Sequence, residues 1–290
     1  MNMIKRSFIP VNIPLLDGNE KTYLNECIDT GWISSEGPFI KKFEDIFSKK
    51  VNRKHGIAVS SGTAALDIAI EALGIGSGDE VILPTFTIIS CIGQIIRCGA
   101  KPVLIDSDPT NWNMDISQIE SKITARTKAI MIVHIFGLPV DLDPVLALAQ
   151  KHGLKVIEDA AQSFGATYKG QRSCGLSQIG CTSFFPAKPL GAYGDAGACF
   201  TPDSSLSDRI REIRDHGQSG RYQHVRIGIN GRMDTLQAAV LHAKLDIFDD
   251  ELQSRVRAAE KYSSLLKESE VAGKLQLPQL EPHNFSSWAQ

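Results

Sequence analysis

The chain has 290 residues, 42% hydrophobic and 22% charged, which is ordinary globular composition with room for one large α/β domain and part of another. The formal net charge is −2, with acidic and basic residues interspersed, so charge gives no case for nucleic-acid or membrane-surface binding. No apolar stretch approaches the roughly 18 residues of a membrane span, and residues 1–10 lack an apolar export segment. We therefore expect a cytoplasmic protein.

Short apolar runs rich in β-branched residues alternate with helical patterns along most of the chain. Strands are predicted at 56–60, 80–84, 101–106, 128–133, 154–158, 181–185 and 198–201, with helices at 63–73, 88–98 and 143–151. Strands separated by helix-length segments predict a mostly parallel seven-stranded sheet with helices on both faces. Gly153 is predicted to end a helix in the left-handed conformation.

A long helical pattern runs from residue 234 to about 267, with little strand signal after it. It predicts the exit from a large domain and the start of a second one. Six cysteines are scattered along the chain without a CxxC pair, so they indicate buried small hydrophobic residues in a reducing compartment and no metal site.

A lysine, Lys188, follows the predicted strand 181–185 in a loop dense with glycine. Loops at strand ends are where α/β proteins place reactive groups, and a partly desolvated lysine can lose its proton and attack a carbonyl. By position alone, an exposed loop lysine is the favoured interpretation.

Two acids, Glu158 and Asp159, end the predicted strand 154–158, so one of them must point into the crevice above the sheet. A carboxylate there can hold the pyridine nitrogen of pyridoxal phosphate (PLP), whose protonated ring is the better electron sink. Asp159 is the candidate, with Gln162 placed to contact the ring face or its 3-oxygen. Taken alone, an acidic helix N-cap is the better interpretation.

The predicted strand 56–60 leads through Ser-Gly-Thr into the predicted helix 63–73. Backbone N–H groups and a hydroxyl converge there, where the helix dipole favours anions, so Gly62, Thr63 and Ala64 indicate a phosphate-binding turn. As a bare N-cap motif, this pattern is common.

These patterns occur in the order phosphate-binding turn, acid, lysine, each at a strand end. Together they resemble the DegT/DnrJ/EryC1/StrS family, the PLP-dependent sugar aminotransferases of fold type I. The resemblance runs from about Ile9 to the last residue and includes the blocks 79–87, 158–162, 183–188, 228–233 and 237–239.

The resemblance implies a role for each matching residue. Lys188 would hold PLP as a Schiff base and move protons, and Asp159 would hold the pyridinium. The ring and phosphate contacts would come from Gln162, Phe86, Gly62, Thr63, the Ala64 backbone and Ser183. Asn230 would reach the phosphate of the neighbouring subunit, which implies a homodimer with shared active sites. Arg232 has two equally favoured interpretations, a structural salt bridge and a role near the site.

The implied chemistry is a two-step exchange. L-glutamate donates its amino group, leaving pyridoxamine phosphate and 2-oxoglutarate, and a keto-sugar linked to a nucleoside diphosphate is then aminated. The N-terminal half is similar to enzymes that aminate C4 of a GDP-linked sugar, and the C-terminal half to enzymes that aminate C3 of UDP-linked sugars. Both regiochemistries stay open.

By the same resemblance, residues 1–240 form the large PLP-binding domain. Residues 241–290 begin a small C-terminal domain that we expect to be incomplete, with residues 288–290 opening a strand. Ala196 stands where the family usually has glycine, and its methyl group requires a negative φ.

Two alternatives differ in class. A truncated, catalytically impaired PLP-binding paralogue could serve as a regulatory or partner subunit. A nucleotide-binding dehydrogenase is disfavoured, because neither GxGxxG after the first strand nor GxxxxGK[ST] occurs.

Overall fold

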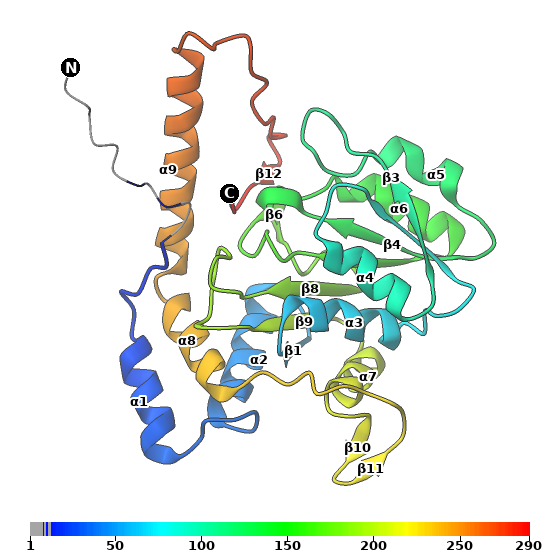
Figure 1. Ribbon diagram of the computed structural model, residues 1–290, viewed down its shortest axis with the longest axis vertical. Coiled ribbons are helices and arrows are strands. Elements are labelled where there is room, and N and C mark those ends of the chain that lie inside the picture. The colour runs from blue at the N-terminus through cyan, green and yellow to red at the C-terminus, as the bar shows by residue number, and fades with distance from the viewer. Residues whose placement is uncertain (1–7, 9, 11–12) are drawn as a thin grey trace.

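A seven-stranded sheet forms the centre of the computed structural model, which describes residues 8, 10 and 13–290 (Figure 1). The expectation about an export segment in residues 1–10 lies largely outside this part. The strand order is β1-β9-β8-β5-β4-β2-β3, and β9 runs antiparallel to both neighbours while the other strands are parallel to one another. The strands are β1 (His55–Val59), β2 (Glu80–Pro84), β3 (Lys101–Ile105), β4 (Thr127–Val133), β5 (Lys155–Asp159), β8 (Ile179–Ser183) and β9 (Gly197–Thr201).

All seven predicted strands are confirmed, each within two residues of the predicted bounds. The predicted helices are confirmed as α3 (Gly62–Ala72), α4 (Ile89–Arg97) and α6 (Leu142–His152). Gly153 ends α6 with a φ of 67°, the left-handed conformation that glycine adopts without steric cost. The mostly parallel α/β fold predicted from the alternation is therefore correct.

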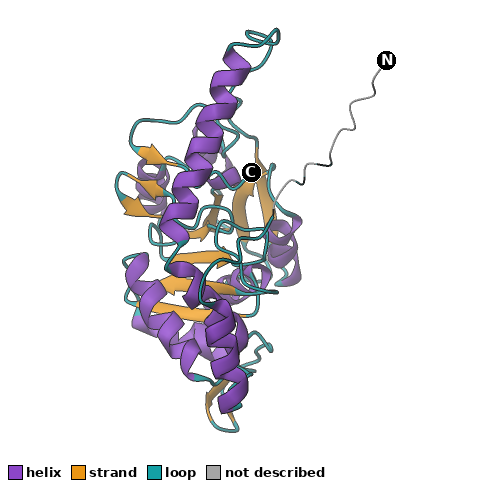
Figure 2. Ribbon diagram, turned by 90° about the vertical axis from the view of Figure 1, so that its left-hand side faces the viewer, coloured by secondary structure: helices purple, strands orange, loops and turns teal. Residues whose placement is uncertain are grey.

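Helices cover both faces of the sheet (Figures 1 and 2). Successive side chains of a strand point to opposite faces. Val81 and Leu83 accordingly join the core formed with α3, α4 and α7 (Ser204–Arg214), whereas Ile82 lies in the core on the side of α6.

A cluster of phenylalanines fills the core where α2 (Pro38–Lys50) covers the sheet. Phe47 of α2 lies 5.5 Å from Phe184, ring centre to ring centre, and Phe164 lies 5.3 Å from Phe184. Phe43 contacts the same ring edge-on. Because Phe184 directly follows β8, this packing fixes the start of the loop that carries Lys188.

The single helix predicted from 234 to 267 is wrong in one respect, because the chain breaks at Asp246 and Ile247. It forms α8 (Thr235–Leu245) and α9 (Phe248–Lys267). Helix α8 is largely buried and packs on α1 (Glu20–Thr30) and α2, whereas α9 buries only its first turns and extends away from the sheet (Figure 1). Tertiary packing therefore redirects a continuous helical pattern.

Helices α1, α2 and α7 were not predicted from the sequence, and neither were the shorter elements. The shorter elements are α5 (Ile119–Lys122), the 3₁₀ turns Ile116–Gln118 and Ile135–Gly137, the hairpin β10 (Gln218–Gly220) with β11 (Gln223–His224), and a three-stranded sheet of β12 (Asn284–Phe285), β6 (Thr167–Tyr168) and β7 (Gln171–Arg172).

The strand expected to open at 288–290 lies instead at β12, which pairs with β6. The residues after β12 hydrogen-bond the turn between β4 and α6, with Ser287 N donating to Gly137 O and Ala289 N to Phe136 O. Ala196 does not have a positive φ, so its buried methyl group is accommodated as expected.

A buried polar network lies behind the carboxyl end of β5. Glu158 is fully buried and accepts hydrogen bonds from His134 Nε2, Cys174 N and Leu176 N. His134 Nδ1 accepts a hydrogen bond from Val140 N, so Nε2 carries the ring proton and donates to Glu158. Of the two acids that end β5, Glu158 is therefore the structural one, because it accepts hydrogen bonds from several buried donors.

Replacing Glu158 with alanine should lower the free energy of unfolding by about 3 kcal/mol or more, because it leaves several buried donors without an acceptor. Chemical denaturation measures the change. Glu120→Ala is the control, since Glu120 is half exposed and its ion pair with Lys151 should contribute no more than about 1 kcal/mol. A loss below about 1 kcal/mol in Glu158→Ala would contradict this role.

Candidate active site

Asp159 is the last residue of β5, the middle strand of the sheet, and only 3% of its surface is exposed. Its Oδ1 accepts a hydrogen bond of 3.0 Å from Ala161 N, and its Oδ2 accepts one of 2.9 Å from Cys91 Sγ. A carboxylate has about four acceptor positions, so lone pairs remain for a further donor. The crevice at the carboxyl ends of the strands is where α/β sheets bind ligands.

The loop that carries Lys188 is held at several points. Phe184 N donates to Ala196 O, and Ala192 N donates to Phe184 O, so the two ends of the loop are tied together. Helix α8 contributes Lys244, whose Nζ donates to Gly191 O at 2.9 Å, and Gln237, whose Oε1 accepts from Tyr193 N. The backbone around Lys188 is therefore fixed by the core around Phe184 and by α8.

The Lys188 amine lies in a partly desolvated position near Asp159. Burial lowers the pKa of Lys188 from its ordinary 10.5, and the negative charge of Asp159 partly offsets that fall. A lysine whose pKa is lowered carries more unprotonated amine at neutral pH, which is the form that attacks a carbonyl. The structure thus brings Lys188 and Asp159 together, as the sequence predicted.

A tight turn through Ser61 and Gly62 connects β1 to α3. A Cβ added at Gly62 would lie 2.7 Å from Ser183 Cβ, so glycine is required for the close approach of α3 to β8. Ser61 Oγ accepts a hydrogen bond from Ala64 N and caps α3, while Thr63 Oγ1 contacts Ser90 Oγ at 3.0 Å. Gly62, Thr63, Ala64 and Ser183 are therefore neighbours at a helix N-terminus, a preferred place for an anion.

Gln162 and Phe86 follow the carboxyl ends of β5 and β2, two strands of the same sheet. Gln162 Oε1 accepts a hydrogen bond of 2.6 Å from Phe136 N, so the amide holds the turn between β4 and α6. Phe86 is 44% exposed and makes edge-on contacts with Trp112 and Phe136, 5.7 and 5.8 Å between ring centres. Contact of either residue with a cofactor ring stays a prediction.

Asn230 and Arg232 lie in the segment after the β10–β11 hairpin, which runs beside the end of β1, where Val59 and Arg232 form an isolated β-bridge. Asn230 is exposed and forms an isolated β-bridge with Asp215. Arg232 makes a salt bridge with Asp215, and its Nε donates to Ser35 Oγ at 3.1 Å, so the structural interpretation of Arg232 is confirmed. Any contact of Asn230 with a neighbouring subunit stays a prediction.

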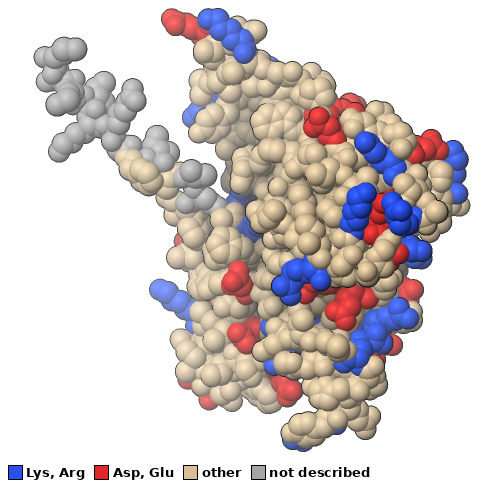
Figure 3. Space-filling view, turned by 45° about the vertical axis from the view of Figure 1, so that its right-hand side comes forward, with Lys and Arg blue, Asp and Glu red and all other residues tan. Residues whose placement is uncertain are grey.

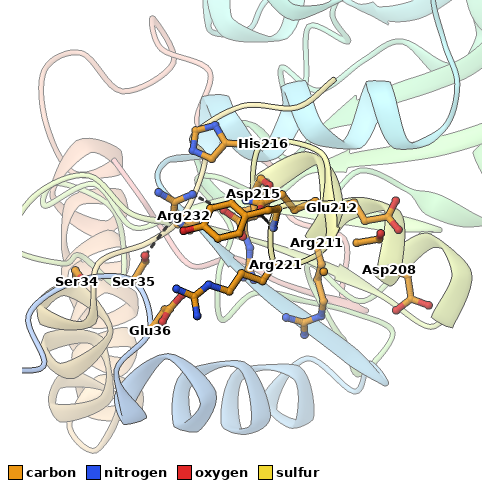
Figure 4. Close-up of a pocket in the computed structure, with 15 residues that line it drawn as sticks. Ser34, Ser35, Glu36, Asp208, Arg211, Glu212, Asp215, His216, Arg221 and Arg232 are labelled. Atoms are coloured by element: carbon orange, nitrogen blue, oxygen red, sulfur yellow. Dashed lines mark hydrogen bonds and ion pairs between the residues drawn. The ribbon is translucent and has the colours of Figure 1, made fainter. Parts of the chain in front are cut away.

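Arg232 also lines a cavity of about 1140 Å³ (Figure 4). Its charged lining comprises four arginines and four acids, namely Arg211, Arg214, Arg221, Arg232, Glu36, Asp208, Glu212 and Asp215. The charges balance, and Arg211 and Arg214 are bound to Glu44, so the cavity shows no preference for an anion. None of the residues around Lys188 and Asp159 lines it.

Three residues of the site were missed by sequence reasoning. Ser61 belongs to the Ser-Gly-Thr turn that the sequence singled out, and the structure shows it as the N-cap of α3. Cys91, Ser90 and Phe136 were missed because their contacts join segments far apart in the sequence.

The fold and these residues define a PLP-dependent enzyme of fold type I. A model of the DegT/DnrJ/EryC1/StrS aminotransferase family matches residues 14–290, and the chain belongs to this family. UDP-2-acetamido-2-deoxy-3-oxo-D-glucuronate aminotransferase of Pseudomonas aeruginosa is 49% identical, covering 88% of this chain and 70% of that protein. GDP-perosamine synthase of Caulobacter vibrioides is 45% identical, covering 89% of this chain and 70% of that protein.

Solved structures show the same fold. The crystal structure of NtdA from Bacillus subtilis with the bound cofactor PMP matches with a TM-score of 0.87 and 32% identity, covering 93% of this chain and 61% of that chain. PMP is the amino form of PLP. The residues of the present chain fit this cofactor, because a buried carboxylate, a desolvated amine and a helix N-terminus that Gly62 allows to pack against Ser183 lie at the carboxyl ends of neighbouring strands.

The rate at which the cofactor-free chain binds PLP should rise with pH through a midpoint below 10.5, because the unprotonated fraction of Lys188 rises as pH passes its lowered pKa. Stopped-flow absorbance measures this rate. Asp159→Asn should move the midpoint lower still, since it removes the negative charge that favours the ammonium form. A midpoint at or above 10.5 would show that Lys188 is not desolvated.

Proposed function

We propose that this chain transfers an amino group from L-glutamate to a keto-sugar linked to a nucleoside diphosphate, in amino-sugar biosynthesis for a surface polysaccharide or a glycosylated metabolite. The observation that carries the proposal is the desolvated amine of Lys188 next to the buried carboxylate of Asp159. The names of the relatives support a sugar-nucleotide substrate, and they do not favour the alternative of a non-catalytic paralogue. PLP, when bound, supplies an electron sink and carries the amino group between the two substrates.

In this proposal each residue has a defined task. Asp159 would accept a hydrogen bond from the protonated ring nitrogen, and such charge-assisted hydrogen bonds are stronger than neutral ones. Lys188 Nζ would hold the cofactor until the amine of the donor displaces it, and the freed amine would then take up and return the proton at the carbon that loses or gains the amino group. The phosphate contacts come from Gly62, Thr63, the Ala64 backbone and Ser183, and the ring contacts from Gln162 and Phe86.

The substrate class is supported more closely than the individual sugar. The two relatives act on a UDP-linked 3-oxo sugar acid and in GDP-perosamine synthesis, according to their names. Both UDP- and GDP-linked keto-sugars, aminated at C3 or C4, are therefore candidates. Acidic and basic side chains are interspersed on the face in Figure 3, so this face carries no large basic patch of the kind that binds nucleic acid.

A homodimer with shared active sites completes the proposal. The segment before Asn230 carries exposed apolar side chains at Tyr222, Val225 and Ile227, and 88% of the Ile227 surface is accessible. Exposed apolar groups of this kind are typical of subunit interfaces. Asn230 would then reach the phosphate site of the partner subunit.

Domain division and compartment belong to the same proposal. Residues 1–240 form the large PLP-binding domain, and 241–290 begin the small one. A cytoplasmic location is supported by the free cysteines Cys181 and Cys199, which face each other across β8 and β9 without a disulfide. Within the described part of the chain, no helix has both the length and the apolar character needed to cross a membrane.

The function is tested by incubating the PLP-loaded chain with L-glutamate and UDP- or GDP-linked 3-keto and 4-keto sugars. Wild type should form an amino-sugar nucleotide and one 2-oxoglutarate for each, measured by mass spectrometry. Lys188→Ala should lose at least about 10³-fold in rate, since its proton transfers and its covalent hold are both removed. The exposed Lys169→Ala is the control. Equal turnover in Lys188→Ala and wild type would refute the assignment.

Shared active sites are tested by complementation. In a hybrid of Lys188→Ala and Asn230→Ala subunits, one site carries both defects and the other carries none, so activity should return to a sizeable fraction of wild type. A hybrid of Lys188→Ala and Asp159→Ala leaves a defect in each site and should stay inactive. No recovery in the first hybrid would show that Asn230 does not act across subunits.

A further inference from the structure

Cys91 makes a contact with Asp159 that the proposed chemistry does not yet use. Its Sγ lies 2.9 Å from Asp159 Oδ2, and the side chain is fully buried in the first turn of α4. Thr87 Oγ1 lies 3.1 Å from the same sulfur. The thiol thus stands between a hydroxyl and the carboxylate.

The direction of the Cys91–Asp159 hydrogen bond follows from chemistry. An ionised carboxylate can only accept, so the thiol donates to it. Burial, and then the charge of Asp159, raise the pKa of Cys91, so the thiol keeps its proton throughout the neutral range. Cys91 is therefore a permanent donor and not a reactive thiolate.

The contact fixes the carboxylate in space. Ala161 N holds Oδ1 and Cys91 holds Oδ2, so both oxygens of Asp159 are oriented by donors from different segments. The residue before Cys91, Ser90, contacts Thr63 at the phosphate-binding turn. The first turn of α4 thereby links the two ends of the site.

Other cysteines of the chain do not share this arrangement. Cys181 and Cys199 both lie near Ala65 O, at 3.4 and 3.5 Å, and Cys98 lies near Ile95 O. These acceptors are neutral backbone carbonyls. Among the cysteines in the described part of the chain, Cys91 is the one whose thiol donates a hydrogen bond to a carboxylate.

We propose that Cys91 is a positioning residue that orients Asp159 and moderates its charge through the thiol hydrogen bond, and so sets the electronic state of the bound cofactor. This inference rests on the proposed function, in which Asp159 holds the pyridine nitrogen. Removing the donor would leave a more basic carboxylate, which stabilises nearby positive charge more strongly.

The first test is a pH titration of the visible absorbance of bound PLP in wild type, Cys91→Ala and Cys91→Ser. The pH at the midpoint of the absorbance change should rise by about half a pH unit to one pH unit in Cys91→Ala, because Asp159 loses a hydrogen-bond donor. Cys91→Ser keeps a donor and should stay within about 0.2 units of wild type. Cys27→Ala is the control, because the Cys27 side chain is also inaccessible to solvent and lies in α1. An unchanged or lowered midpoint in Cys91→Ala would overturn the proposal.

The second test needs neither PLP nor turnover. The infrared difference between wild type and Cys91→Ala isolates the S–H stretch of Cys91 in the cofactor-free chain. The band should lie below that of Cys27, taken from the matching Cys27→Ala difference, and should move up in Asp159→Ala. If the S–H band of Cys91 has the same frequency in wild type and in Asp159→Ala, the hydrogen bond from Cys91 to Asp159 is contradicted.

The two proposals fail in different ways. If Lys188→Ala and Asp159→Asn bind PLP with wild-type spectra, the proposed function fails. If those variants lose the spectrum while Cys91→Ala behaves as Cys27→Ala does, only the role of Cys91 fails.

Discussion

The Asp159 carboxylate is a buried charge at the carboxyl end of the middle strand of the sheet, and the site is organised around it. Removing a carboxylate from water costs several kcal/mol unless donors replace the lost hydration. Ala161 N and Cys91 Sγ supply two of these donors, and the nearby Lys188 amine supplies favourable charge when protonated. A cofactor with a protonated ring nitrogen would satisfy the lone pairs that remain.

Lys188 lies in the loop after β8, which is the strand next to β5. The start of this loop is fixed by Phe184 in the aromatic cluster, and its middle is held by Lys244 of α8. These contacts come from residues far from the reacting atoms, yet they determine where the amine lies. A rigid support of this kind allows a reactive group to be both desolvated and precisely placed.

Local patterns predicted the sheet, the helices α3, α4 and α6 and the residues at the strand ends, because periodicity and glycine placement act over a few residues. The break at Asp246 and Ile247 contains neither glycine nor proline; α8 packs on α1 and α2 before it, and Phe248 is buried in the aromatic core directly after it. The donor role of Cys91 joins positions 68 residues apart, and a pattern of buried cysteines could not distinguish it from core packing. Family resemblance assigned roles to Gln162 and Asn230 that depend on a cofactor and a second subunit.

The most direct measurement of the central claim is to load the chain with one equivalent of PLP, reduce it with borohydride, digest it and locate the modified lysine by mass spectrometry. Reduction fixes PLP to the amine that holds it. The account predicts modification at Lys188 in wild type and a strong loss of that modification in Asp159→Asn. Modification at Lys169 or Lys244 instead, or spread evenly over many lysines, would contradict it.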